Sequence, residues 1–166
     1  MSTQPVYCVD TNVVIWAIKQ QATPGQEQMV TKAQKLLNKL VAEKGVLLLP
    51  TVVLAEALIK PDDDQTRLQL VKEMSRAFLV APFDVQAAVE FARLWNHARR
   101  SMSVAGGKPS DPDYTRTELK ADLLILATAI AARATHMVAG DRRLLEMSKP
   151  WMQPVPVQGN GSTPED

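Results

Sequence analysis

Four carboxylates interrupt or follow stretches of the chain that otherwise carry no charge: Asp10, Glu56, Asp122 and Asp141. Desolvating a carboxylate costs several kcal/mol unless another group pairs with it. No Lys or Arg lies within these uncharged stretches, so a bound cation is the most economical single partner for all four acids. This pattern makes the four acids the first candidates for chemistry.

The elements that must position these acids follow from the hydrophobic pattern. Short apolar runs alternate with segments of helical period, which is typical of an α/β domain with a parallel sheet. Thr51 is the expected N-cap of one helix, and the Gly-rich and Pro-rich stretch 102–116 is expected to be a long loop. We expect strands over 6–10, 46–50, 78–80 and 136–139, a possible fifth near 154–157, and helices over 12–20, 26–43, 51–59, 64–77, 84–101, 118–133 and 141–147.

Length and composition favour a single soluble domain. The 166 residues are 46% apolar and 22% charged, and the formal net charge of +1 neither requires nor excludes a nucleic-acid partner. The single cysteine, Cys8, allows no internal disulfide and is expected to be a buried core residue of a cytoplasmic protein. No secretory signal and no membrane span is expected. We expect a domain over 1–150 and a tail over 151–166 that is largely disordered after the possible short strand.

The expected topology brings the four acids together. In open parallel sheets, functional groups gather at the carboxyl ends of the strands, near the point where the strand order reverses. Asp10 ends the first strand, Asp141 follows the fourth, and Glu56 lies in the helix that leaves the second. Asp122 faces the same edge if its helix packs with the usual right-handed crossover. Carboxylates without His or Cys suit Mg²⁺ or Mn²⁺, which can activate water and hold a phosphate, so the predicted chemistry is phosphodiester hydrolysis.

Four segments of the chain resemble the motifs of PIN-domain proteins: residues 9–12, 54–57, 121–129 and 138–144. Within that family, the chain is most similar to the toxin ribonucleases of VapBC-type toxin–antitoxin modules. The resemblance implies a doubly wound α/β/α sandwich around a parallel sheet of four to five strands. It also implies an endoribonuclease that uses Mg²⁺ or Mn²⁺ to cut RNA, forms a homodimer and is silenced by a small antitoxin protein.

The family's site residues transfer to this chain one by one. Asp10, Glu56 and Asp122 match the three strongest acidic positions, and Asp141 matches a fourth that the family holds less strictly. Asn12 matches a small polar residue expected to orient Asp10 or a water on the metal. The family often has Thr or Ser where this chain has Ala139, so one hydroxyl contact is in doubt.

Other charged and aromatic residues have ordinary structural explanations. The run 62–64 resembles a solvated helix cap, and turn chemistry explains Asp111 and Asp113. Glu118 fits either an outer metal ligand or a surface ion pair. Arg142 and Arg143 fit RNA phosphate contacts and a charged helix surface equally well.

Three hypotheses remain open on the sequence alone. The leading one is the metal-dependent ribonuclease, and the second is a catalytically weak or inactive PIN-like interaction module. A third is an aspartyl-phosphate enzyme, with Asp10 as the nucleophile at the end of the first strand. A phosphatase of the haloacid-dehalogenase-like kind would need Asp at position 12, where this chain has Asn12.

Overall fold

The fold is built on one parallel sheet with helices on both sides. The computed structural model describes residues 3–104 and 114–157. The sheet order among these residues is β3-β2-β1-β4-β5, so the strand order reverses next to β1, and every neighbouring pair is parallel. The predicted α/β fold class is therefore confirmed, and so is the possible fifth strand. The strands are β1 Val6–Val9, β2 Val46–Pro50, β3 Leu79–Ala81, β4 His136–Ala139 and β5 Gln153–Pro156.

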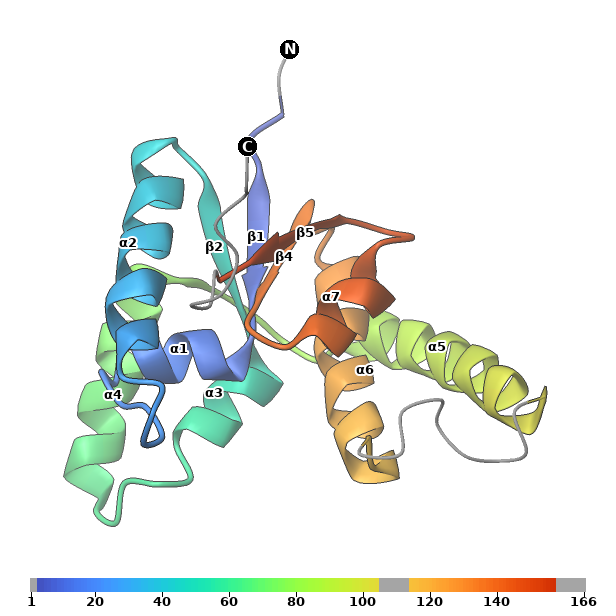
Figure 1. The fold of residues 1–166 in the computed structure, drawn as a ribbon, viewed down its shortest axis with the longest axis horizontal. Coiled ribbons are helices and arrows are strands. Elements are labelled where there is room, and N and C mark those ends of the chain that lie inside the picture. Colours follow the sequence, from blue (N-terminus) through green and yellow to red (C-terminus); the bar gives the residue numbers. More distant parts are fainter. Residues whose placement is uncertain (1–2, 105–113, 158–166) are drawn as a thin grey trace.

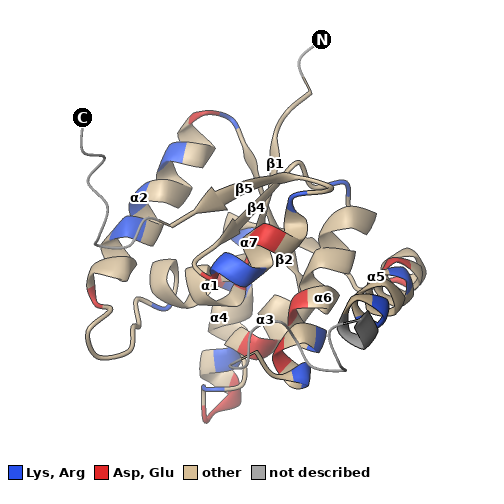
Figure 2. Ribbon diagram, turned by 45° about the vertical axis from the view of Figure 1, so that its right-hand side comes forward, with Lys and Arg blue, Asp and Glu red and all other residues tan. Residues whose placement is uncertain are grey.

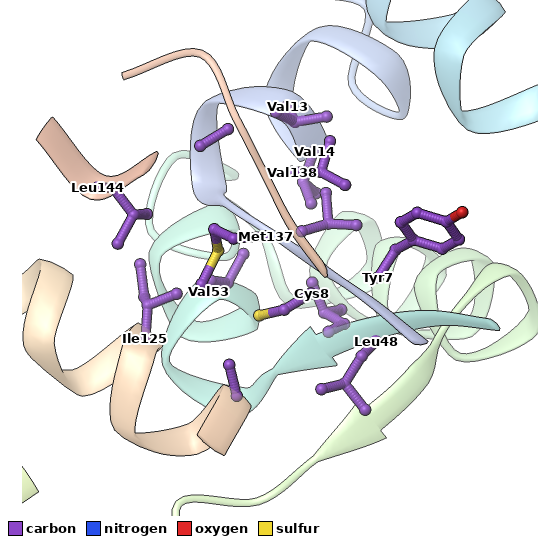
Figure 3. Close-up of a cluster of buried hydrophobic side chains, with 14 of the residues drawn as sticks. Tyr7, Cys8, Val13, Val14, Leu48, Val53, Ile125, Met137, Val138 and Leu144 are labelled. Atoms are coloured by element: carbon purple, nitrogen blue, oxygen red, sulfur yellow. The ribbon is translucent and has the colours of Figure 1, made fainter. Parts of the chain in front are cut away.

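Strand β1 occupies the middle of the sheet and is buried on both faces. Cys8 lies in register with Leu48 of β2 on one side and Met137 of β4 on the other, and all three are almost fully buried. Figure 3 shows these side chains packed together in the interior. Cys8 is thus the core residue that the sequence predicts, and burial raises the pKa of its thiol.

Helices cover the sheet in two outer layers. Figure 1 shows α1 and α2 on one side of the sheet and α5 and α6 on the other. Among the described residues, no helix is both long enough and apolar enough to span a membrane. The helices are α1 Thr11–Ala17, α2 Gln28–Ala42, α3 Thr51–Ala57, α4 Asp64–Ala77, α5 Val85–Val104, α6 Arg116–Ala131 and α7 Arg142–Ser148.

The expected start of the helix after β2 is wrong by one residue. Thr51 is the first residue of α3 and not its N-cap, which is Pro50. The Thr51 hydroxyl instead accepts a hydrogen bond from the Phe83 N–H at 3.1 Å and so connects α3 to the segment after β3. This contact spans 32 residues of sequence, so local cap preferences could not reveal it.

The expected loop over 102–116 is shorter at both ends. Helix α5 continues to Val104, because no Gly or Pro interrupts it before that point. Helix α6 begins at Arg116, because Thr115 and Glu118 form a capping box in which each side chain accepts a hydrogen bond from the other residue's N–H. Residues 105–113, which include Asp111 and Asp113, lie outside the described residues, as does the expected disordered tail from residue 158 onward.

Candidate functional site

Asp10 is at the carboxyl end of the central strand, where β1 turns into α1. Its main-chain N–H donates to the Val138 carbonyl of β4 at 3.0 Å, which fixes the backbone at the edge of the sheet. Its carboxylate is the N-cap of α1 and accepts a hydrogen bond from the Thr11 N–H at 2.7 Å. The side chain is only 6% exposed, so a helix cap alone leaves this acid unusually desolvated.

Glu56 lies in α3, which follows β2 with no intervening loop. It points back to the end of β1, where the Thr11 hydroxyl donates a hydrogen bond to its Oε2 atom. The residue is half-buried. Thr11 therefore joins two of the predicted acids, through its N–H to Asp10 and through its hydroxyl to Glu56.

Asp122 lies in the second turn of α6 and is also half-buried. Its Oδ2 atom accepts a hydrogen bond of 2.5 Å from the hydroxyl of Tyr114. Tyr114 is 8% exposed, and its hydroxyl also lies 3.9 Å from the sulfur of Met147 in α7. The segment before α6 thus delivers a buried phenol to the carboxylate of Asp122.

Asp141 follows β4 and is the N-cap of α7. Its Oδ1 atom accepts from the Arg143 N–H at 2.8 Å, and its Oδ2 atom pairs with the Arg143 guanidinium at 3.1 Å. The preceding residue, Gly140, packs against the indole of Trp16, and a Cβ atom at Gly140 would lie 2.5 Å from the ring. Close packing of α1 on this glycine therefore fixes the backbone that carries Asp141.

The four acids influence one another electrostatically. Burial raises the pKa of the Asp10 carboxyl to about 7, the Thr11 N–H opposes that rise, and the charges of Asp122, Glu56 and Asp141 add to it. Burial raises the pKa of Asp122 to about 6, which the Tyr114 hydrogen bond opposes and the Asp141 charge reinforces. Like charges affect one another in this way only at short range, so the structure brings the four predicted acids to one edge of the sheet.

The donors at this edge are of the kind that a hard divalent cation prefers. They are carboxylate oxygens, and the most buried of them, Asp10, receives its side-chain hydrogen bond from a single main-chain N–H. Within residues 3–104 and 114–157, no three His, Cys, Asp or Glu side chains are close enough to hold one ion as they stand. Contacts with Thr11, Tyr114 and Arg143 hold all four acids. The chemistry of the donor set fits Mg²⁺ or Mn²⁺.

The remaining predicted site residues have different surroundings. Asn12 is exposed, and no hydrogen bond connects its side chain to another described residue. Arg142 is exposed at the start of α7, whereas Arg143 pairs with Asp141 and stacks over Tyr114. Figure 2 shows the basic start of α7 and the acidic segments of α3 and α6. Glu118, for which the sequence left an outer metal ligand and a surface ion pair open, forms the capping box of α6 with Thr115.

Sequence reasoning missed two residues of this site, Thr11 and Tyr114. Thr11 lies between Asp10 and Asn12, which the sequence does single out. Its hydroxyl contacts Glu56, which is 45 residues away in the sequence. Tyr114 lies eight residues before Asp122 and precedes α6, which begins at Arg116. The contact between the two residues therefore depends on how the chain enters this helix, and their spacing alone does not predict it. One signal was available, since Tyr114 is one of only two tyrosines in the chain.

Known proteins share both the sequence pattern and the fold. Residues 7–150 match the model of the PIN domain family, while a comparison with curated proteins gives no match. Among solved structures, DNA-bound VapBC from Salmonella typhimurium has a chain 18% identical to this one with a TM-score of 0.60, covering 93% of this chain and 100% of that one. VapBC2 from Rickettsia felis, bound to a DNA fragment from its promoter, gives 17% identity and a TM-score of 0.59, covering 91% and 98%.

VapBC-1 from nontypeable Haemophilus influenzae has the same fold again. It is 14% identical, with a TM-score of 0.60 and coverage of 92% of this chain and 98% of that one. At these identities the likeness to solved structures is one of fold. The family match spans every strand except β5 and all four acids, from β1 to the end of α7. This chain belongs to the PIN domain family.

Proposed function

We propose that this protein is a metal-dependent endoribonuclease that cleaves RNA phosphodiester bonds, and that it is the toxin of a toxin–antitoxin pair in the cytoplasm. One observation carries the proposal. The carboxylate of Asp10 is buried at the end of the central strand, and this burial, together with the charges of three further acids, raises its pKa to about 7. An uncompensated arrangement of this kind is costly to the fold, which makes it characteristic of a functional site.

Asp10, Glu56, Asp122 and Asp141 would hold the ion. A bound Mg²⁺ or Mn²⁺ supplies positive charge that acidifies water and neutralises a leaving oxyanion. The chain's own residues prepare the acids for this role, because the Thr11 N–H and hydroxyl hold Asp10 and Glu56 in a fixed relation. Burial of Asp10 keeps competing water away from its carboxylate. Asn12 is exposed two residues after Asp10, and in this proposal it contacts the substrate or a water at the ion.

The substrate assignment rests on the charge next to the acids. Four carboxylates alone would repel a phosphodiester, so a polyanionic substrate needs both the ion and nearby cations. Arg142 is exposed at the start of α7, directly after Asp141, and offers a cation to a backbone phosphate. Arg143 adds a second positive charge next to Arg142, although it also pairs with Asp141.

The toxin assignment is supported by the similar solved structures. Three of them are VapBC structures whose matched chains are covered almost end to end by this chain. By analogy we propose that this protein forms a homodimer and that a small antitoxin protein binds it and blocks the acidic edge of the sheet.

Parallel RNA cleavage assays test the proposed activity. The purified wild type should cut RNA in Mg²⁺ or Mn²⁺ and stop when EDTA is added. Asp10→Asn and Asp122→Asn should remove cleavage while circular dichroism shows an unchanged fold. Equal cleavage by the wild type and both variants would reject the proposal, since it would assign the activity to a contaminant or to another site.

One observation favours a second candidate, a PIN-like interaction module without catalysis. No three acids among the described residues are grouped closely enough to hold one ion as they stand. Calorimetric titration with Mn²⁺ separates the two candidates. A nuclease should bind the ion in a manner that Asp10→Asn abolishes, whereas an inactive module should show no binding that depends on the acids.

A further inference from the structure

Tyr114 contacts two different parts of the acidic edge. Its hydroxyl donates a 2.5 Å hydrogen bond to Asp122 of α6, and its ring packs beneath the guanidinium of Arg143 of α7. The distance from the guanidinium carbon to the ring centroid is 4.4 Å, which is a close cation–π contact. One buried side chain thus connects an acid on one helix with a cation on the next.

Arg143 extends this connection to Asp141. Its Nε atom lies 3.3 Å from Oδ1 of Asp141, and a terminal nitrogen lies 3.1 Å from Oδ2. The planar guanidinium can stack on the ring and pair with the carboxylate simultaneously, because its donors lie in the plane of the group. The resulting chain of contacts runs Asp122, Tyr114, Arg143, Asp141, and it links the two acids across α6 and α7.

We propose that Tyr114 is a positioning residue that fixes Asp122 through its hydroxyl and Asp141 through Arg143, so that the two carboxylates are held in one arrangement for a divalent cation. The inference rests on the proposed function, because it assigns Tyr114 a part in the same metal site. Groups that orient the ligands of a metal commonly change its affinity by about 10-fold to 100-fold when they are removed.

The chain offers a matched control for the Tyr114 hydroxyl in its other tyrosine. The other tyrosine of the chain, Tyr7, is equally buried at 8% exposure, and its hydroxyl makes no hydrogen bond to another described residue. Tyr7 lies in β1 beside His136, on a part of the core away from the contacts of Tyr114, and so provides a matched control.

Mn²⁺ binding measured by electron paramagnetic resonance tests the proposal. The signal of free Mn²⁺ gives the affinity, and the line shape of bound Mn²⁺ reports the symmetry of its ligands. Tyr114→Phe keeps the ring under Arg143 and removes only the hydroxyl, so the variant should bind Mn²⁺ about 10-fold more weakly and with an altered line shape. Tyr7→Phe, which loses the same atom elsewhere, should match the wild type in both.

The possible outcomes separate this inference from the proposed function. Wild-type binding that Asp10→Asn leaves unchanged would reject the metal site itself. Binding to Tyr114→Phe within two-fold of wild type, with the same line shape, would reject only the role of Tyr114. If Tyr114→Phe does not fold, Arg143→Lys tests the role of Tyr114. This variant keeps a positive charge for Asp141 but loses the planar guanidinium that stacks on the Tyr114 ring. That variant should also weaken Mn²⁺ binding, and wild-type affinity would overturn the proposal.

Discussion

The molecule contains two groups of acidic residues whose surroundings shift carboxyl pKa values in opposite directions. The run 62–64 precedes α4, where Asp63 accepts hydrogen bonds from the N–H and hydroxyl of Thr66, both at 2.7 Å. Asp64 pairs with Arg67 at 2.7 Å while its side chain stays 92% exposed. The Thr66 hydroxyl and N–H lower the pKa of Asp63, whereas burial and three neighbouring acids raise that of Asp10 to about 7.

The difference shows that proximity in sequence is a poor sign of a metal site. Three consecutive acids remain in solvent, and local partners stabilise their charges. Four acids scattered over the chain meet at an edge of the sheet where burial raises the pKa of Asp10 and of Asp122. A functional acidic cluster is therefore better identified by desolvation and like-charge neighbours than by the number of acids in a run.

Cleavage should separate the two groups most strongly. Asp10→Asn should reduce RNA cleavage by about 100-fold or more, because it removes a carboxylate that would hold the ion. Asp63→Ala should leave the rate within about two-fold of wild type, because Asp63 is exposed and makes its side-chain contacts with Thr66, not with the four acids. Initial cleavage rates at saturating Mg²⁺ measure both effects. A loss of cleavage in Asp63→Ala as large as that in Asp10→Asn would contradict the functional difference between the two groups of acids.

Stability should move in the opposite direction to activity at Asp10. Its folded pKa of about 7 lies above the ordinary value of 3.8, so the folded protein holds this proton more tightly than the unfolded chain does. The metal-free protein should therefore lose stability as the pH rises from about 4 to about 7. Asp10→Asn escapes this loss, and Asn also caps helices well, so its free energy of unfolding at pH 8 should exceed that of wild type by about 1 to 3 kcal/mol.

Denaturant unfolding in EDTA at pH 5 and pH 8 gives both values. The advantage of Asp10→Asn should be larger at pH 8 than at pH 5. A variant less stable than wild type at pH 8 would show that the Asp10 charge is well compensated in the fold, which contradicts the comparison.

Gly140→Ala tests how the backbone before Asp141 is positioned. The added Cβ would lie 2.5 Å and 2.7 Å from two atoms of the Trp16 six-membered ring, so the free energy of unfolding should fall by about 1 to 3 kcal/mol. In a Trp16→Phe background the cost should shrink, because Phe carries no atoms at those positions. Equal costs in the two backgrounds would exclude the contact with Trp16 as the cause.

The smallest effect is expected at the surface run. Asp63→Ala removes the N-cap of α4, so the melting temperature should fall, but by less than in Gly140→Ala. Because the pKa of Asp63 is lowered in the fold, its contribution is present above pH 3.8 and disappears as the pH falls through the lowered value. Melting curves of the variant and wild type should therefore converge in acid, and a constant difference at all pH values would argue against this origin.

Much of this molecule follows from its sequence, because the signals are local and repeated. Short apolar runs such as 46–50 favour buried strands, and the parallel order then delivers Asp10, Glu56 and Asp141 to one edge. Asp122 required the additional assumption of right-handed crossovers, and the structure brings it within electrostatic reach of Asp141.

The rest depends on contacts between distant segments. Thr51 is of a residue type that N-cap positions favour, yet its hydroxyl accepts a hydrogen bond from the N–H of Phe83, after β3. The Thr11 hydroxyl finds Glu56 only when α3 packs beside α1, and Tyr114 finds Asp122 only because a capping box starts α6 at Arg116. Hydrogen bonds of this kind are set by tertiary packing, so residue types and spacing do not reveal them.

A carbon NMR titration of the side-chain carboxyl groups tests the central claim most directly, since it observes both acidic groups in one sample. Without Mg²⁺, Asp10 should titrate near pH 7 and Asp63 below 3.8. Saturating Mg²⁺ should lower the Asp10 midpoint by at least about one pH unit, because binding requires the ionised carboxylate, and should leave Asp63 unchanged. An Asp10 midpoint near 3.8 that does not respond to Mg²⁺ would contradict the account.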